Sequence, residues 1–235
     1  MSALRSSARR AGVIYLVMSL VGAPALLFLP RFIVPGDAAA TAQRIADGAP
    51  VYRLLMLGDL AGSILFVVLG WSLYQLFETV NRPQALLMLL LVLVSATLGM
   101  VDVALLSPPI VFSAHPGSLS AFTPAQLDAL TLGLLRIRSM ELRANEMLWG
   151  LWLVPFGLLV IRSGFIPKVI GWLLLLACVG YVAMSTAYIG FPAYSAAADR
   201  VGNWLIQGEL VVIFWLLIKG ARSDVPTLDA GPATA

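Results

Sequence analysis

Long apolar runs, separated by short polar or Pro- and Gly-rich segments, dominate this chain. Six of them approach or reach the ~20 residues that a helix needs to cross a bilayer core. The pattern therefore predicts an all-α membrane protein built as a bundle of six transmembrane helices. The predicted spans are residues 11–29, 53–76, 84–106, 145–161, 169–189 and 203–218.

The segments between the predicted spans carry turn and cap signals. Pro35-Gly36-Asp37 predicts a turn in which Asp37 is the N-cap of a short helix over residues 38–46. Residues 78–83 predict one tight turn, and Ser163-Gly164 with Pro167 predicts another, because glycine ends a helix readily and proline starts the next.

The segment before the fourth span predicts an additional helix. Thr123 suits its N-cap, Pro124 its first position and Gln126 the reciprocal cap. Four aliphatic residues then recur at helical spacing: Leu127, Leu130, Leu134 and Ile137. This stripe predicts an amphipathic surface helix on the outer side that leads into the fourth span, with Arg136 and Arg138 off the stripe.

Small residues inside the spans predict close helix contacts. Gly58 and Gly62 are spaced for close approach of a second helix, either within the chain or in a homo-oligomer. Gly150 and Gly157 lie two turns apart and predict a groove for a neighbouring helix. Pro155 predicts a kink in the fourth span, since it removes one backbone hydrogen bond.

Composition agrees with a membrane location. Hydrophobic residues make up 60% of the chain and charged residues 11%, with a mean hydropathy of +0.93, whereas soluble domains carry about 25% charged residues. We predict a single transmembrane helical domain over residues 1–222 and a disordered tail over residues 223–235.

The basic residues suggest an orientation. Arginines before the first run could belong to a signal peptide, but the length of the run and its prolines favour an uncleaved span. The N-terminus and every short turn then lie inside, which predicts a multi-pass protein of the bacterial cytoplasmic membrane with both termini cytoplasmic. The inside set is Arg5, Arg9, Arg10, Arg82, Arg162, Lys168, Lys219 and Arg222.

Under this topology, four acidic residues lie at a similar depth. Each is within about two turns of the outer end of its span, for instance Asp59 roughly 9 Å below Arg53. Charged groups inside a membrane protein face other helices or water, so these acids are expected to meet in one polar layer. The candidate ligand-binding residues are Arg53, Asp59, Asp102, Arg143, Asn145, Glu146, Trp149 and Glu209.

Simpler interpretations of the same residues remain open. The charges can form an interhelical network that only fixes the packing, or can be wetted near the surface. Trp149, Trp152 and Trp204 are explained mainly as an outer interfacial belt, with ligand stacking as the alternative. His115 is expected to be an exposed loop residue.

Several classes of chemistry are excluded by the residues present. One histidine cannot supply both axial ligands of a haem, and no HExxH zinc site, P-loop or Gly-x-Ser-x-Gly elbow occurs. Cys178 is the only cysteine, so a disulfide within the chain is excluded, and it is expected to be a buried core residue. We expect no metal, no cofactor, no catalytic residue and no nucleic-acid partner.

The chain resembles a family of bacterial multi-pass membrane proteins known only as domain of unknown function 4386. The longest matching piece is residues 146–171, EMLWGLWLVPFGLLVIRSGFIPKVIG. The resemblance implies a helical bundle in a bacterial inner membrane and brings no known activity. Shorter matching pieces are Arg10-Ala11-Gly12, Tyr15-Leu16, Pro35-Gly36-Asp37 with Thr41, Leu73-Tyr74, Val80-Asn81-Arg82 and Ala85-Leu86-Leu87.

Three functional hypotheses follow. The first is a protein that binds or translocates a small polar solute or a lipid headgroup at the polar layer, with Asp59, Glu146 and Glu209 as acidic ligands and Arg53 and Arg143 as counter-charges. The second is a non-catalytic membrane scaffold or partner subunit. The third is an intramembrane lipid-modifying enzyme, which ranks last because no nucleophile or metal cluster is visible.

Overall fold

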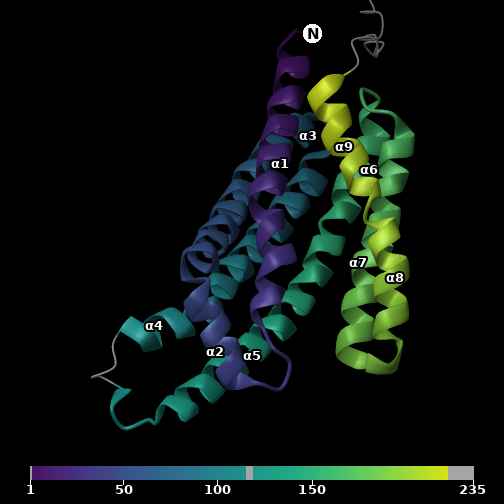
Figure 1. Ribbon diagram of the computed structural model, residues 1–235. Helices are drawn as coiled ribbons and strands as arrows, with labels where there is room; N and C mark the ends of the chain where they lie inside the picture. Colours follow the sequence, from purple (N-terminus) through teal and green to yellow (C-terminus); the bar gives the residue numbers. More distant parts are fainter. Residues whose placement is uncertain (1, 115–118, 222–235) are drawn as a thin grey trace, which may run out of the picture.

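The computed structural model describes residues 2–114 and 119–221, and within these ranges the chain is helical and contains no strand (Figure 1). The elements are α1 (Ser2–Phe28), η1 (Leu29–Phe32), α2 (Ala38–Asp47), α3 (Ala49–Leu106), α4 (Pro108–Ala114), α5 (Pro124–Leu151), α6 (Leu153–Ser163), α7 (Lys168–Gly190), η3 (Pro192–Tyr194), α8 (Ser195–Leu205) and α9 (Gly208–Ile218). The predicted disordered tail and His115 lie outside the described residues.

Five stretches of the described chain are long and apolar enough to cross a membrane. They are Leu4–Phe32, Ala49–Ser113, Pro124–Ser163, Lys168–Gly190 and Pro192–Ile218. The second stretch contains both the second and the third predicted span.

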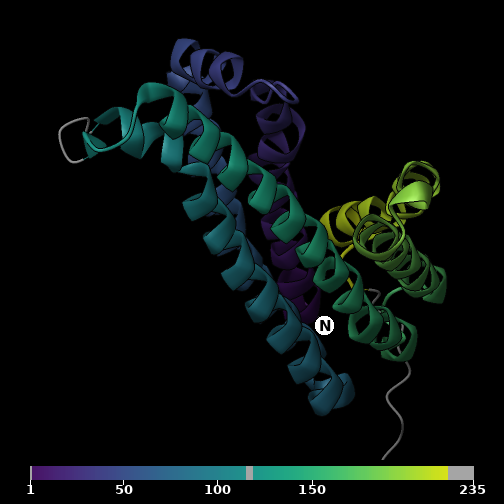
Figure 2. The same ribbon diagram turned by 90° about the horizontal axis from the view of Figure 1, so that it is seen from below.

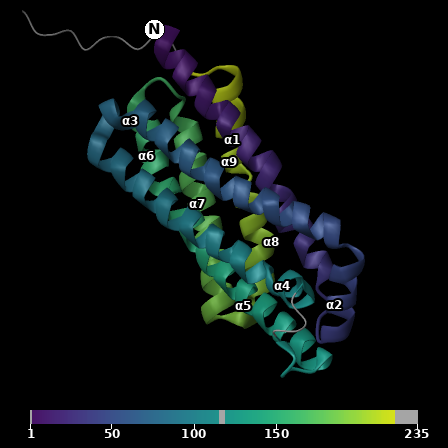
Figure 3. The same ribbon diagram turned by 90° about the vertical axis from the view of Figure 1, so that its left-hand side faces the viewer.

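α3 is a helical hairpin rather than one straight rod. Asn81 has non-helical backbone angles, φ −161° and ψ 99°, and its side chain accepts a hydrogen bond from Gln84 N at 3.0 Å, which caps the second arm. Gly70 faces Val92, and Gly99 faces Ser63, so the two arms run antiparallel about residue 81 (Figure 3). The turn predicted over residues 78–83 is confirmed.

Glycines let the helices approach closely at the predicted places. A Cβ on Gly58 would lie 2.8 Å from Val21 O, and one on Gly62 would lie 3.1 Å from Gly22 Cα. The close approach expected at this glycine pair is therefore made by α1 of the same chain. A Cβ on Gly157 would meet the backbone of α7 at 2.8 Å, which confirms the predicted groove.

Two of the five apolar stretches, Pro124–Ser163 and Pro192–Ile218, are interrupted helices. Trp152 separates α5 from α6, one turn before Pro155, whose ring nitrogen has no hydrogen to bond with Leu151 O. The region 190–202, which lies between two predicted spans, forms η3 and most of α8. A break at Ile206-Gln207 then separates α8 from α9, so the predicted sixth span is two short helices.

The predicted helix caps are confirmed. Asp37 accepts a hydrogen bond from Ala40 N at 2.9 Å and caps α2. Thr123 and Gln126 form the reciprocal capping box of α5, and Gly164 ends α6 with a φ of 71°, which glycine adopts without strain.

The apolar stripe predicted on α5 is not the face that packs inside the protein. Leu130 is 44% exposed and Ile137 57% exposed. The buried face carries Thr131, Leu135 and Arg138, because α5 packs there against α2 and α3 instead of lying flat on a surface. α5 also continues without interruption from Pro124 to Leu151, so the surface helix and the start of the fourth span are one element.

Five helices form a closed ring of neighbours. α3 contacts α1 and α5, α7 contacts α5 and α9, and α9 contacts α1. Seen from below, the green and yellow helices of the C-terminal part lie on one side of α5 and the blue arms of α3 on the other (Figure 2). The chain start and the end of α9 lie at the same end of the ring (Figure 1), where Arg9 bonds Ile218 O at 2.9 Å.

Candidate functional site

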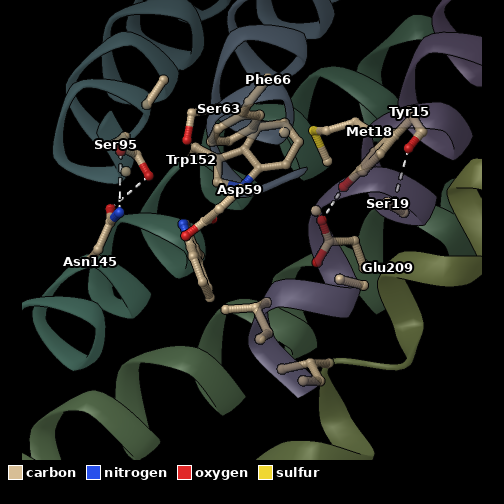
Figure 4. A pocket seen from close by; sticks show the side chains of 18 of the residues that line it. Tyr15, Met18, Ser19, Asp59, Ser63, Phe66, Ser95, Asn145, Trp152 and Glu209 are labelled. Atoms are coloured by element: carbon tan, nitrogen blue, oxygen red, sulfur yellow. Dashed lines mark hydrogen bonds between the residues drawn. The ribbon is translucent and has the colours of Figure 1, made fainter. Parts of the chain in front are cut away.

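The ring of α1, α3, α5, α7 and α9 encloses a cavity of about 320 Å³ (Figure 4). This volume lies at the lower end of the range of ligand pockets, about 300–1,000 Å³. The charged residues that line it are Asp59, Asp102 and Glu209, and its described lining contains no lysine, arginine or histidine. The cavity is therefore acidic.

The cavity gathers five of the eight predicted ligand-binding residues. Asp59, Asp102, Asn145, Trp149 and Glu209 line it. They come from both arms of α3, from α5 and from α9, so the structure brings these side chains together from distant parts of the chain.

Three predicted residues, Arg53, Arg143 and Glu146, are not part of the cavity lining. Arg53 has an exposed side chain at the start of α3. Arg143 bonds Glu146 at 3.1 Å and Asp199 of α8 at 3.0 Å, and its guanidinium lies 4.9 Å from the centre of the Tyr188 ring. These contacts tie α5 to α7 and α8 beside the cavity.

The counter-charge of the cavity acids is Arg138, not the expected Arg53 or Arg143. Its Nε donates to Asp102 Oδ2 at 2.9 Å, and its Nη2 lies 3.8 Å from Asp59 Oδ2. Arg138 is only 3% exposed, because it projects from the buried face of α5 toward the two arms of α3. The ion pairs therefore join α5 to both arms of the hairpin.

This buried cluster contains more acid than base. Glu141 lies one turn after Arg138 and has Asp102 as a near neighbour. In the described part of the chain, neither carboxyl oxygen of Glu141 has a hydrogen-bond partner, and the same holds for Asp59 Oδ2 and Asp102 Oδ1. Three carboxyl groups face one guanidinium, so two negative charges need a bound proton or a bound cation when the cluster is away from water.

Glu209 forms the other polar end of the cavity. Tyr15 of α1 and Tyr181 of α7 both donate their hydroxyl hydrogens to its carboxylate, Tyr181 at 3.1 Å. The helix break before Gly208 places Glu209 in the first turn of α9, where the helix dipole favours a negative charge. The carboxylate thus links three of the five ring helices.

Aromatic side chains form much of the wall between the two polar ends. Phe66 meets Trp152 edge-on with ring centres 5.3 Å apart, and Trp149 meets Tyr181 edge-on at 6.1 Å. The interfacial-belt interpretation is wrong for Trp152, which is 2% exposed because it fills the interior at the α5–α6 break. Trp204, by contrast, is 82% exposed on α8.

Asn145 has a positioning role that its bonds make plain. It accepts a hydrogen bond from Ser95 Oγ at 2.7 Å and donates one to Ser95 O at 3.2 Å. Both residues are buried. This reciprocal pair fixes the height of α5 against the second arm of α3, and with it the height of Arg138.

Four residues of the site were not among the predicted ones: Arg138, Glu141, Tyr15 and Tyr181. One signal for Arg138 was present: Thr131, Arg138 and Asn145 recur at seven-residue spacing and mark one polar face of α5. The two tyrosines gave no such signal, because a tyrosine in an apolar helix is equally typical of a core or an interface position.

The fold and the cavity define an all-helical protein with long apolar helices around an acidic interior. The chain belongs to the family described as Domain of unknown function (DUF4386), whose model matches residues 10–220. A protein of Archaeoglobus fulgidus described as uncharacterized is 35% identical over 74 residues, which cover 32% of this chain and 43% of that protein. No solved structure matches the chain.

Proposed function

We propose that this is a multi-pass protein of the bacterial cytoplasmic membrane, a single domain with six spans, that binds and translocates a small polar solute or a lipid headgroup. The observation that carries this proposal is the acidic cavity between the five ring helices. Intramembrane acids that face a cavity are typical of solute and ion pathways.

The distribution of apolar side chains supports a lipid environment. Many large hydrophobic residues point outward from the helices, among them Leu20, Leu54, Leu57, Val169 and Trp172. Several of the charged groups lie inside instead, as Asp102 and Arg138 do. A protein in water would expose far less apolar surface in contiguous patches.

The end of the ring where α1 starts and α9 ends supports the proposed orientation. Arg162, at the end of α6, bonds Gln84 of the hairpin turn at 3.0 Å, and Arg9 bonds the end of α9. The basic residues of the short turns thus gather at one end, which the positive-inside rule places in the cytoplasm. The cavity lies in the other half of the ring, toward α2 and α4.

The contacts around the cavity favour the binding hypothesis over a scaffold and over a lipid-modifying enzyme. A scaffold would use its glycine pair Gly58/Gly62 for a partner, but α1 of the same chain packs on that face. A homo-oligomer would therefore need another surface. An enzyme acting on lipid would need an activated nucleophile. The lining contains three serines, but its described residues include no histidine or lysine that could activate one of them.

The test is to fill the cavity and measure binding. The purified protein is screened by thermal shift against small solutes of each charge type, and hits are titrated by calorimetry. Ala23→Leu adds volume at the cavity wall on α1. It should therefore lower the affinity for every solute found in the screen by about tenfold or more. Ala144→Leu, at an exposed position of α5, is the matched control and should bind like the parent.

A negative screen, or equal binding by the two leucine variants, would remove the basis of the proposal. Where Ala23→Leu lowers affinity, uptake of the same solute into proteoliposomes tests translocation. Uptake that does not exceed that of protein-free vesicles would limit the function to binding.

A further inference from the structure

We propose that the ligand of this cavity is an organic cation, an ammonium group carried on a small apolar or aromatic body. The inference rests on the proposed function, since it names the ligand class of the same cavity. It follows from three features: the charge of the lining, the partly exposed carboxylate of Asp59 and the aromatic wall.

The charge of the lining selects against anions and for cations. The lining carries three carboxyl groups and, in its described residues, no basic side chain. Arg138 lies behind Asp59 and Asp102 and is already bonded to Asp102. Glu141 adds a further carboxyl group to the same cluster. A cation entering the cavity would balance charge that the protein's own groups leave unbalanced.

Asp59 gives the ammonium group a definite place. It lines the cavity, and its side chain is 16% exposed. Asp102 is less accessible, because it is 2% exposed and already accepts a hydrogen bond from Arg138. An ammonium group donates hydrogen bonds and carries the complementary charge, so the Asp59 carboxylate is the expected contact. Glu209 is less available, because Tyr15 and Tyr181 already donate to it.

The aromatic wall fits the body of such a ligand. Phe66, Trp149 and Trp152 line the cavity together with the two tyrosines that bond Glu209. Aromatic faces attract cations and also pack against apolar groups, which is the usual arrangement for recognition of substituted ammonium ions. Figure 4 shows Phe66 and Trp152 in the wall of the cavity that Asp59 also lines.

The same lining disfavours a phosphate-bearing lipid headgroup. A phosphate placed beside an ammonium group would meet carboxyl groups without a basic side chain on the wall to bind it. The chemistry shared by a free amine and a choline headgroup is the ammonium, and the lining favours the free amine.

The first experiment uses the unmodified protein and three probes of one shape. Binding of 2-phenylethylamine, 2-phenylethanol and 3-phenylpropionate is measured by calorimetry in the same detergent. The amine should bind about tenfold or more tighter than the neutral alcohol, and the anion should bind weakest. Equal or tighter binding of the alcohol or the anion overturns the inference while the cavity remains a binding site. Absence of binding by all three counts against the proposed function itself.

The second experiment places the ammonium group. Asp59→Asn should weaken binding of 2-phenylethylamine by about tenfold and leave 2-phenylethanol unchanged. Asp128→Asn, on α5 outside the lining, is the matched control and should change neither. If Asp59→Asn binds the amine like the parent, the assignment of the Asp59 carboxylate as the ammonium contact is wrong. Should Asp59→Asn fail to fold, the probe series on the unmodified protein still decides the ligand charge.

A third measurement distinguishes the two sources of an ammonium group. Choline and phosphocholine compete with 2-phenylethylamine for the purified protein. Displacement by choline alone supports a free cation. Displacement by phosphocholine at equal concentration would overturn the preference for a free cation and assign the site to a headgroup.

Discussion

Two arginine clusters lie five residues apart on α5 and use their charges differently. Arg138 is buried and bonds Asp102, with Asp59 and Glu141 close by and several of their oxygens unpaired. Arg143 is 26% exposed in its side chain and makes good hydrogen bonds to both Glu146 and Asp199. The first cluster borders the cavity, and the second ties helices together at its side.

The difference shows that proximity of opposite charges does not identify a binding site. The guanidinium of Arg143 donates hydrogen bonds to carboxylate oxygens and lies over the Tyr188 ring. A structural role in joining helices is therefore enough to explain why these charged residues are present. At Arg138 the carboxyl groups outnumber the guanidinium, so the cluster is incomplete without a proton or a ligand. Incomplete pairing, not charge alone, marks the functional candidate.

Removal of each arginine should give the largest contrast. Arg138→Met leaves the buried Asp102 without its partner, and loss of one member of a buried pair costs about 3–5 kcal/mol. Arg143→Met breaks a partly exposed pair and should cost about 1 kcal/mol. Thermal unfolding followed by tryptophan fluorescence in detergent measures both. Equal losses would show that the two clusters are alike in burial and energy.

Two tyrosines on α7 provide the next contrast. Tyr181→Phe removes a hydrogen bond to the carboxylate of Glu209 and should lower stability by about 2 kcal/mol. Tyr188→Phe keeps the ring that faces Arg143, so it should change stability by less than about 0.5 kcal/mol. The same unfolding assay compares them, and a larger loss for Tyr188→Phe would contradict the assignment of Tyr181 to the cavity.

The two glutamates beside the arginines should differ in the sign of their effect. Glu141→Gln removes a carboxyl group whose oxygens have no described partner, so stability should stay equal or rise by up to about 1 kcal/mol. Glu146→Gln removes a paired charge and should lower stability by roughly 0.5 kcal/mol. A clear loss in Glu141→Gln would mean that this carboxylate is needed to balance Arg138.

Salt should change the stability loss of the two arginine variants unequally. This is the smallest of the effects predicted here. Ions screen exposed charges at a Debye length of about 10 Å in 0.1 M salt and about 3 Å in 1 M salt, and they screen buried pairs much less. The stability difference between the parent and Arg143→Met should therefore shrink by a few tenths of a kcal/mol over this range. The stability difference between the parent and Arg138→Met should stay the same as salt is raised. If it decreases as much as the difference for Arg143→Met, Arg138 is in contact with solvent.

Local signals in the sequence predicted much of the fold. The capping box at Thr123, the N-cap at Asp37 and the turn at Gly164 depend on neighbouring residues only, and each is confirmed. The hairpin about Asn81 was likewise predicted from the turn residues between two apolar runs. Two features were not predicted: the face of α5 that packs against α2 and α3, and the helices of the region 190–202. Both depend on which helices pack against them.

For the candidate site, the sequence predicted how deep the acidic residues lie along their helices but not which residues they pair with. Counting turns from the ends of the spans placed Asp59, Asp102 and Glu209 at a similar level, and all three line one cavity. The same count could not say that Glu146 turns away from the cavity to Arg143, which also bonds Asp199 in the region between two predicted spans. Depth follows from residue number along a helix, whereas direction around the helix also depends on its rotation in the bundle.

The amino-acid order by itself determined that the chain forms long apolar helices, where most of these helices begin and turn, and which acids interrupt them, because these properties arise from interactions within a few residues. Tertiary structure alone decided that Arg138 balances Asp102, that two tyrosines bond Glu209 and that five helices leave a cavity between them. Those outcomes depend on contacts between residues tens to nearly two hundred positions apart, such as Tyr15 and Glu209. Such contacts are set by helix rotation and close approach at glycines, which periodicity along one helix does not specify.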